Sequence, residues 1–172
     1  MQESVGVTTV FVTHDQEEAL ELADRVVVMS AGKIEQIGKP ADVYNAPTSP
    51  FVHEFLGDTN RFDCRIEAGI VTLPSGTRIG TVDAPDGPAV AYVRPHDIFL
   101  RPEPTGPGTI CHAHAVGPLA RLLVDIAGMA IEITIPGEAW ANKRISIGAR
   151  VDIDIRHGTV FSNGAGVGVA LE

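Results

Sequence analysis

The sequence predicts two parts, an α/β segment over residues 1–57 and an all-β, OB-like barrel over residues 58–172. In the first part, an apolar stretch with the character of a strand runs directly into an amphipathic helical pattern. After residue 60 the pattern changes to short alternating runs separated by Gly, Pro and Asp, which is typical of antiparallel sheet with one wet face. The boundary between the two parts therefore falls at residues 57–60.

The strand predicted over residues 7–13 is rich in β-branched residues, as expected of a fully covered parallel strand. Asp15 then occupies an N-cap position and Glu18 completes a capping box, so a helix is expected over residues 15–23. His14 would lie just beyond the carboxyl end of the strand, where open α/β sheets bind ligands. A neutral imidazole can donate from one nitrogen and accept with the other, which suits a phosphate oxygen beside an attacking water. The alternative is a histidine satisfied by the loop around it.

Two strands and two short helices are predicted in the rest of the first part. The strands are 25–30 and 33–38, joined by a tight turn at Ala31-Gly32. The helices are 40–45 and 50–57, and Ser49 is the expected cap of the second. In the second helix Phe51, Phe55 and Leu56 are expected to form the packed face, with His53 on the wet side.

The second part contains many short strands with turn signals between them, which favours a small barrel of the OB type. The predicted strands are 62–67, 70–73, 77–82, 89–93, 109–116, 120–125, 130–135, 150–155 and 159–161. Ser75-Gly76 and Ala127-Gly128 are the expected hairpin turns, residues 102–108 are expected to form a loop, and residues 162–169 are expected to fray.

Charge and composition exclude several classes of function. The net charge of −9 leaves no basic stripe for nucleic acid or anionic lipid. Aromatic residues make up 5%, too few for a base-stacking surface, so an OB-type nucleic-acid binder is disfavoured. No apolar run is long enough to span a bilayer. Cys64 and Cys111 lie far apart without CxxC spacing, which favours small buried thiols in a reducing compartment.

Three segments carry a resemblance to a known family. They are Thr13-His14-Asp15-Gln16-Glu17-Glu18-Ala19, Ala23-Asp24-Arg25-Val26-Val27-Val28-Met29 and Gly32-Lys33-Ile34. Together they resemble the switch-histidine region of ABC-transporter ATPases, most closely the ATP-binding subunits of bacterial importers of the sulfate, maltose and spermidine group. The resemblance implies that residues 1–57 are the C-terminal piece of a P-loop ABC ATPase domain. It also implies that His14 is catalytic and cofactor-binding, contacting the γ-phosphate of ATP and helping to poise the hydrolytic water.

A further segment, Tyr92-Val93-Arg94-Pro95-His96-Asp97-Ile98, resembles a signature of the regulatory domain called TOBE, which this family carries at the same place. His96 stands where the wider group often has Glu, which leaves the partner of Arg94 open. Arg94 and Asp97 are expected to form a structural ion pair. Likeness at Asn60-Arg61-Phe62 and at Arg94 to Ile98 suggests the sulfate or thiosulfate branch.

The family resemblance implies cofactors and partners for the intact parent protein. These are ATP with Mg²⁺, transmembrane permease subunits and a second ATPase subunit that completes a homodimer. The implied location is cytoplasmic and peripheral on the inner face of the plasma membrane, without direct membrane insertion. No nucleic-acid partner is expected.

The residues needed for ATP hydrolysis are incomplete in this sequence. It contains no GxxxxGK[ST] P-loop, no apolar strand ending in Asp-Glu and no Leu-Ser-Gly-Gly-Gln-like run. Phosphoryl transfer depends on all of these parts together, so the chain is expected to be inactive alone and to hold no cofactor by itself. The alternative function is a regulatory module that senses a small oxyanion and has no ATPase activity.

Other groups of polar residues favour structural interpretations. Cys111, His112 and His114 invite a metal site, but the thiol falls on the opposite strand face from the two imidazoles, so a solvated face is expected. Asp152 and Asp154, at strand spacing, are expected to be solvent-facing charges.

Overall fold

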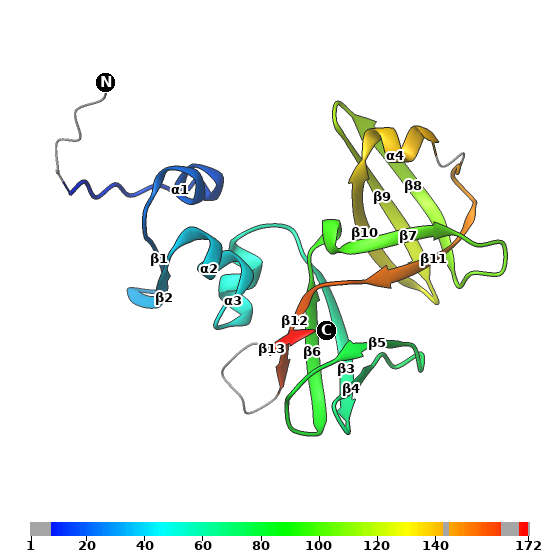
Figure 1. Cartoon of the computed structure of the whole chain (residues 1–172), viewed down its shortest axis with the longest axis horizontal. Coiled ribbons are helices and arrows are strands. Elements are labelled where there is room, and N and C mark those ends of the chain that lie inside the picture. The colour runs from blue at the N-terminus through cyan, green and yellow to red at the C-terminus, as the bar shows by residue number, and fades with distance from the viewer. Residues whose placement is uncertain (1–7, 143–144, 163–168, 172) are drawn as a thin grey trace.

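The computed structural model describes residues 8–142, 145–162 and 169–171, which form a mostly β protein with a few short helices (Figure 1). In chain order the elements are α1 (Gln16–Leu22), β1 (Val26–Ser30), β2 (Lys33–Gly38), α2 (Pro40–Asn45), α3 (Pro50–Phe55), β3 (Asn60–Glu67), β4 (Ile70–Thr72), β5 (Arg78–Thr81), β6 (Gly87–Val93), the 3₁₀ turn η1 (Pro95–Asp97), β7 (Ile98–Pro102), β8 (Gly108–Val116), β9 (Leu119–Ile126), β10 (Met129–Pro136), α4 (Gly137–Asn142), β11 (Arg150–Ile155), β12 (Gly158–Ser162) and β13 (Val169–Leu171).

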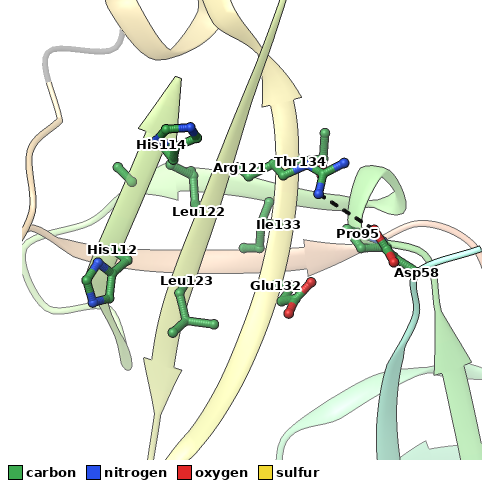
Figure 2. Close-up of a pocket in the computed structure, with 11 residues that line it drawn as sticks. Asp58, Pro95, His112, His114, Arg121, Leu122, Leu123, Glu132, Ile133 and Thr134 are labelled. Carbon is green, nitrogen blue, oxygen red and sulfur yellow. Dashed lines mark ion pairs between the residues drawn. The ribbon is translucent and has the colours of Figure 1, made fainter. Parts of the chain in front are cut away.

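Within these described residues the strands form three antiparallel sheets. The hairpin β1-β2 stands alone, a six-stranded sheet has the order β13-β12-β6-β3-β4-β5, and a five-stranded sheet has the order β10-β9-β8-β11-β7. Figure 1 shows α1, α2, α3 and the hairpin at one end of the molecule, and the five-stranded sheet with α4 at the other. The long strands β8, β9 and β10 lie side by side (Figure 2).

The predicted helix starts are confirmed, because their capping residues act as expected. The Oδ1 of Asp15 accepts a hydrogen bond from the Glu18 N–H at 3.0 Å, and the Oγ of Ser49 accepts one from the Val52 N–H at 3.3 Å. The reciprocal half of the predicted capping box is replaced by another contact, since the Asp15 N–H donates to Thr13 Oγ1 at 3.0 Å. The local sequence therefore sets where α1 and α3 begin.

The hairpin turns predicted at Ala31-Gly32 and Ala127-Gly128 are also confirmed. Both residues of each turn have positive φ, with values of 47° and 76° in the first and 54° and 83° in the second. This pairing is the backbone geometry that joins two adjacent antiparallel strands by the shortest loop. The alanines accept a left-handed conformation that costs roughly 1–2 kcal/mol for an L-residue.

The strand predicted over residues 7–13 is absent from the described part of this stretch, residues 8–13. Val10 and Val12 are 85% and 96% exposed, and no ladder pairs their backbone. A strand needs a neighbour that takes its hydrogen bonds and covers its side chains. The β-branched pattern therefore indicates a strand that is covered by neighbouring structure, and the described residues do not cover this stretch.

The prediction for the packed face of α3 is right for Leu56, which is buried, and wrong for Phe51 and Phe55. Val52 is buried as well, and so is His53, which was expected on the wet side. Phe51 and Phe55 instead stack on each other at 5.6 Å and remain partly exposed. The helix is only six residues long, so its orientation is set by its contacts with the sheet and by the flanking loops, whereas the sequence shows only which side chains share a face.

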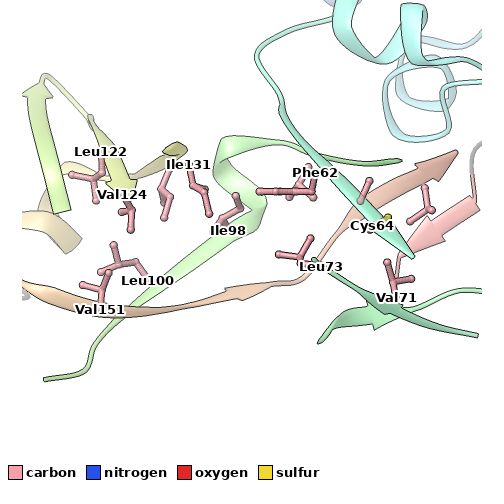
Figure 3. Packing of buried hydrophobic residues seen from close by; sticks show 14 of the residues in the cluster. Phe62, Cys64, Val71, Leu73, Ile98, Leu100, Leu122, Val124, Ile131 and Val151 are labelled. Carbon is pink, nitrogen blue, oxygen red and sulfur yellow. The ribbon is translucent and has the colours of Figure 1, made fainter. Parts of the chain in front are cut away.

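The main core fills the space between the two large sheets and inside the five-stranded one (Figure 3). The alternation predicted for residues 130–135 is confirmed, since Ile131, Ile133 and Ile135 are buried while Glu132 is exposed. Strand β3 alternates in the same way along its whole length. A second, smaller cluster consists of Val26, Val28, Val43, Val52 and Leu56 and lies under the N-terminal helices.

Four of the described elements were not predicted, namely η1, β7, α4 and β13. Strand β7 directly follows the turn at Pro95–Asp97 and extends to Pro102, so the loop expected over 102–108 is shorter than predicted. Helix α4 begins at Gly137 after a proline and has the acidic Glu138 in its first turn. Strand β13 begins at Val169, the last residue of the stretch 162–169 that was expected to fray, and residues 163–168 of that stretch lie outside the described residues.

The side chain of Asn60 links the two large sheets through hydrogen bonds. The Asn60 amide on β3 donates from Nδ2 to the Glu132 carbonyl at 2.7 Å, and its Oδ1 accepts from the Glu132 N–H at 2.8 Å. Glu132 lies on β10, the outer strand of the five-stranded sheet. Asn60 is 7% exposed, so the two hydrogen bonds are shielded from water. The amide thus takes the place of a neighbouring strand at the open side of β10.

Candidate functional site

His14 lies in the bend that leads into α1, and its side chain is exposed to solvent. The backbone that follows is fixed by Asp15, which caps the helix. No residue of α1 is buried, so the imidazole stands on a surface helix end and outside apolar packing. A ligand can reach it, which is the condition that a phosphate-contacting histidine has to meet.

The apolar residues around His14 are unusually open. Phe11 and Leu22 are 43% and 70% exposed, in addition to the two exposed valines of the preceding stretch. The hairpin below adds further apolar side chains on its outer face, namely Val27, Met29, Ile34 and Ile37, each exposed by 46% or more. Exposed apolar side chains gathered in one part of a chain mark a place where another body can pack.

Polar residues from the N-terminal and C-terminal parts of the chain meet at a second location. It is a pocket of about 360 Å³ between α2, α3 and the strands β6 and β12, lined by Tyr44, Asn45, His53, Arg94, His96, Asp97, His157, Gly158 and Thr159. We call it the Arg94 pocket. Arg94 itself is only 4% exposed, although the guanidinium group of an arginine is always charged.

The ion pair predicted between Arg94 and Asp97 does not form among the described residues. The Nη1 of Arg94 donates instead to the carbonyl of Gly57 at 2.7 Å and to that of Asp58 at 3.2 Å. The guanidinium lies over the Tyr44 ring, with Cζ 4.6 Å from the ring centroid. Asp97 faces His96 at 3.9 Å instead. The arginine reaches back to the linker because two carbonyls converge there, and the carboxylate of Asp97, one 3₁₀ turn away, points toward His96.

His53 is the second buried polar residue of the Arg94 pocket, at 3% exposure. Its ring lies 5.5 Å from the Tyr92 ring, and Tyr92 in turn packs edge-on against Phe161. Burial, and then the positive charge of Arg94, lower the pKa of His53 from 6.5 to about 4. The imidazole is therefore neutral in the folded protein at neutral pH.

The lowered pKa predicts that stability falls as the pH is lowered through His53. Between pH 6.5 and about 4, the imidazole of His53 binds a proton in the unfolded chain but not in the folded chain, so protonation favours unfolding. In the wild type, the free energy of unfolding should fall as the pH is lowered through that window. In His53→Gln it should fall less, by up to about 3 kcal/mol. Urea titrations at pH 4, 5, 6 and 7 measure it. The same change at the exposed His112 should leave the slope as it is in the wild type, and equal slopes for both variants would contradict the assignment.

A pocket of about 350 Å³ is lined mainly by residues of β8, β9 and β10, and Figure 2 shows His112 and His114 on β8. Both histidines are exposed, which agrees with the solvated face expected from the sequence. The ion pair across the pocket joins Arg121 and Asp58 at 3.9 Å, with both side chains largely in solvent. Such a pair adds little stability. Within the residues that the structure describes, no three potential metal ligands come together.

The cysteine prediction is half right. Cys64 is buried in the main core, where burial raises the pKa of its thiol. Cys111 is exposed on β8, because the strand bulges between Ile110 and His112 and the alternation of its faces is lost there. Asp152 pairs with Arg101 at 2.7 Å at the surface, and Asp154 is exposed, as expected.

The Arg94 pocket is the feature that reasoning from the sequence missed as a site. Its residues come from segments about a hundred positions apart, and no spacing rule joins Tyr44 to Thr159. The one available signal was the Arg94-Pro95-His96 run, whose arginine had no obvious partner. None of the described helices has the length and apolar character that crossing a membrane requires.

Comparison with known proteins finds relatives that share one name, although no family model matches the chain. It is 43% identical to the sulfate/thiosulfate import ATP-binding protein CysA of Brucella melitensis over 169 residues, which cover 95% of this chain and 46% of that protein. It is 42% identical to the protein of the same name from Nitrosomonas europaea, covering 96% of this chain and 48% of the relative.

A third such protein, from Mesorhizobium japonicum, is 44% identical over 143 residues, or 79% of this chain and 41% of the relative. The chain thus spans about half the length of the curated relatives that it matches. Identity at this level over so much of the chain reflects common descent. Over nearly its whole length, this chain is therefore related to the CysA group of sulfate/thiosulfate import ATP-binding proteins.

Proposed function

We propose that the chain is the C-terminal portion of the ATP-binding subunit of a bacterial ABC importer, and that the intact subunit couples ATP hydrolysis to uptake of sulfate or thiosulfate. The similarity to CysA proteins across about 95% of the chain carries this proposal. The chain would contribute the histidine side of the nucleotide site and a regulatory domain. The phosphate-binding loop and the Mg²⁺ ligands would lie in the remaining part of the subunit.

In this proposal His14 contacts the γ-phosphate of ATP and orients the hydrolytic water. Its exposed position, directly before a capped helix, supports the role, because the cap fixes the backbone while the ring stays accessible. Bound ATP with Mg²⁺ would supply the leaving group and the charge-stabilising metal. His14 supplies one hydrogen-bonding nitrogen at a fixed place, which is a positioning and electrostatic contribution.

The open apolar surface of the N-terminal part supports the same arrangement. The stretch before His14 and the outer face of the β1-β2 hairpin would pack against the remaining part of the ATPase domain, with residues 8–13 as a strand of its sheet. Val10 and Val12, almost fully exposed in this chain, would then be covered on both faces. This arrangement would account both for the strand-like sequence pattern of residues 8–13 and for the exposure of their side chains in this chain.

We further propose a division at residues 57–60 into the ATPase piece, residues 1–57, and a TOBE-type OB-like domain, residues 58–172. Two separate hydrophobic clusters, one on either side of this boundary, support the division. For the barrel, the support is that β10 and β7, which end the hydrogen-bonded order of the five-stranded sheet, contact each other. A sheet whose outer strands meet has the form of a small closed barrel.

The partners follow from the proposed role. They are the transmembrane permease subunits of the importer and a second ATP-binding subunit, placed symmetrically to complete the nucleotide sites. The assembly would sit on the inner face of the plasma membrane, and this chain would reach the membrane through the permease alone.

A hybrid subunit tests the proposal. The region of the Brucella melitensis relative that aligns with this chain is replaced by residues 1–172, and the hybrid is produced with the cognate permease in a strain that lacks its own sulfate importer. We expect ATP-dependent uptake of radiolabelled sulfate within about tenfold of the unmodified relative. The chain alone serves as a negative control, with no ATP turnover above background, since it lacks the P-loop.

Two results would speak against the proposal. One is a hybrid that assembles with the permease, as seen by co-purification, but transports no sulfate. The other is ATP turnover by the purified chain on its own.

A further inference from the structure

The Arg94 pocket contains polar atoms that the folded chain leaves unpaired. The Nε and Nη2 of Arg94 are buried and have no hydrogen-bond partner, and the same holds for Nδ1 of His53. Both side chains line the pocket and both are at least 96% buried. Since buried polar groups in folded proteins are nearly always paired, each of these atoms indicates a partner that does not come from the described chain.

The unpaired atoms of Arg94 have a defined geometry. Nη1 is already engaged by the carbonyls of Gly57 and Asp58. Nε and Nη2 form one edge of the planar guanidinium, and their two N–H groups point in the same direction. This edge binds two oxygens of one oxyanion through parallel hydrogen bonds. The arginine is thus held in place by one nitrogen and offers its bidentate edge.

The surroundings also favour an anion. Tyr44 covers one face of the guanidinium and shields it from water, which strengthens the attraction of its charge for a ligand. His53 adds a neutral ring nitrogen, and Thr159, 7% exposed, adds a hydroxyl at the pocket wall. Asp97 opposes an anion, but its carboxylate is turned toward His96 at 3.9 Å. A pocket of about 360 Å³ has room for a small ion together with water.

We propose that the Arg94 pocket binds a small oxyanion, held by the Nε–Nη2 edge of Arg94 with His53 and Thr159 as further partners. The site joins the two parts of the chain, because Tyr44 and His53 come from α2 and α3 whereas Arg94 and Thr159 come from β6 and β12 and their flanks. An anion bound there stabilises the contact between the N-terminal helices and the six-stranded sheet. The inference is independent of any role in ATP hydrolysis, and it gives the oxyanion-sensing interpretation of the sequence a specific location.

Thermal unfolding of the chain in the presence of oxyanions tests this site. Sodium sulfate, phosphate and acetate are compared with sodium chloride at equal ionic strength, and titration calorimetry measures binding directly. We expect sulfate or phosphate to raise the Tm saturably, by about 3–6 °C at ten times the Kd, and chloride to have no comparable effect. The acetate arm distinguishes a carboxylate ligand from an inorganic oxyanion.

Three substitutions separate binding at the pocket from the general stabilising effect of sulfate on proteins. Arg94→Lys keeps the charge and removes the bidentate edge, so the saturable shift should be lost. His96→Glu places a competing carboxylate in the pocket on a side chain that is 55% exposed, and should abolish most of the shift without preventing folding. His112→Glu makes the same charge change on the exposed face of β8 and should retain the full shift.

An equal shift in the wild type, in His96→Glu and in His112→Glu would overturn the proposal. So would the absence of calorimetric binding for sulfate, phosphate and acetate alike. Because His96→Glu and His112→Glu have the same net charge, a loss confined to the first assigns the effect to the Arg94 pocket.

Discussion

His14→Ala should lower ATP turnover of the hybrid subunit, assembled with its permease, by a factor of about 10²–10³, the range for loss of one preorganised hydrogen-bonding group. The imidazole is exposed and α1 has no buried residue, so truncation of the ring leaves the fold and the helix cap in place. If His14 has the proposed role, the substitution removes a contact to the transition state and spares the packing. The measurement is steady-state ATP hydrolysis at saturating ATP, together with the KM for ATP. The loss should fall mainly on kcat, since a nitrogen that orients water acts in the reaction step.

His112→Ala is the matched control, because it removes another exposed imidazole far along the chain, on β8. Its turnover should stay at the level of the unmodified hybrid. A loss of less than threefold for His14→Ala would remove the assigned role, whatever the transport activity of the hybrid. Equal losses in both variants would point to a general defect of assembly.

Asn60→Ala should destabilise the chain by about 1–3 kcal/mol, because the substitution removes two part-buried hydrogen bonds to the Glu132 backbone, each worth about 0.5–1.5 kcal/mol. The amide of Asn60 is the partner of both the N–H and the C=O of Glu132, at 2.8 and 2.7 Å. Alanine offers neither a donor nor an acceptor, and the residue is too buried for water to replace the amide freely. Urea denaturation of the purified chain measures the loss.

Asn142→Ala is the comparison, since Asn142 ends α4 in an exposed position and its loss should change stability by no more than about 0.5 kcal/mol. Asn60→Leu fills a similar volume without polar atoms. It should be as destabilising as Asn60→Ala if the hydrogen bonds matter more than the packing. A full recovery of stability in Asn60→Leu would show that the amide contributes volume alone.

Local signals were read correctly from the sequence wherever a short segment determines its own structure. Asp15 and Ser49 cap the helices that they were expected to cap. The turn at Ala127-Gly128 and the alternation at Ile131 and Ile133 specify one hairpin and its buried face. In each case the atoms that interact are within a few positions of one another, so the pattern contains the necessary information.

Features that depend on distant contacts could not be predicted in this way. The stretch before His14 has a strand pattern but no neighbour among the described residues, so the pattern alone gave the wrong local structure. His53 was placed on the wet side of its helix, because nothing in α3 indicates that Tyr92 approaches it from β6. Arg94 was given a near neighbour, Asp97, as its partner, whereas its hydrogen bonds go to the linker at Gly57 and Asp58. A long side chain can reach several possible partners, and sequence spacing does not show which of them it contacts.

The uncovered stretch that precedes His14 has a practical consequence for anyone who purifies this chain. Residues 8–12 are uncharged, contain no proline and consist of β-branched and aromatic side chains, with Val10 and Val12 almost fully in water. Such a segment is a template for intermolecular pairing, in which copies from different molecules stack edge to edge into fibrils. Concentrated samples will tend to polymerise through this stretch, and a charged residue in place of Val10 would block the growth of the stack without touching either hydrophobic core.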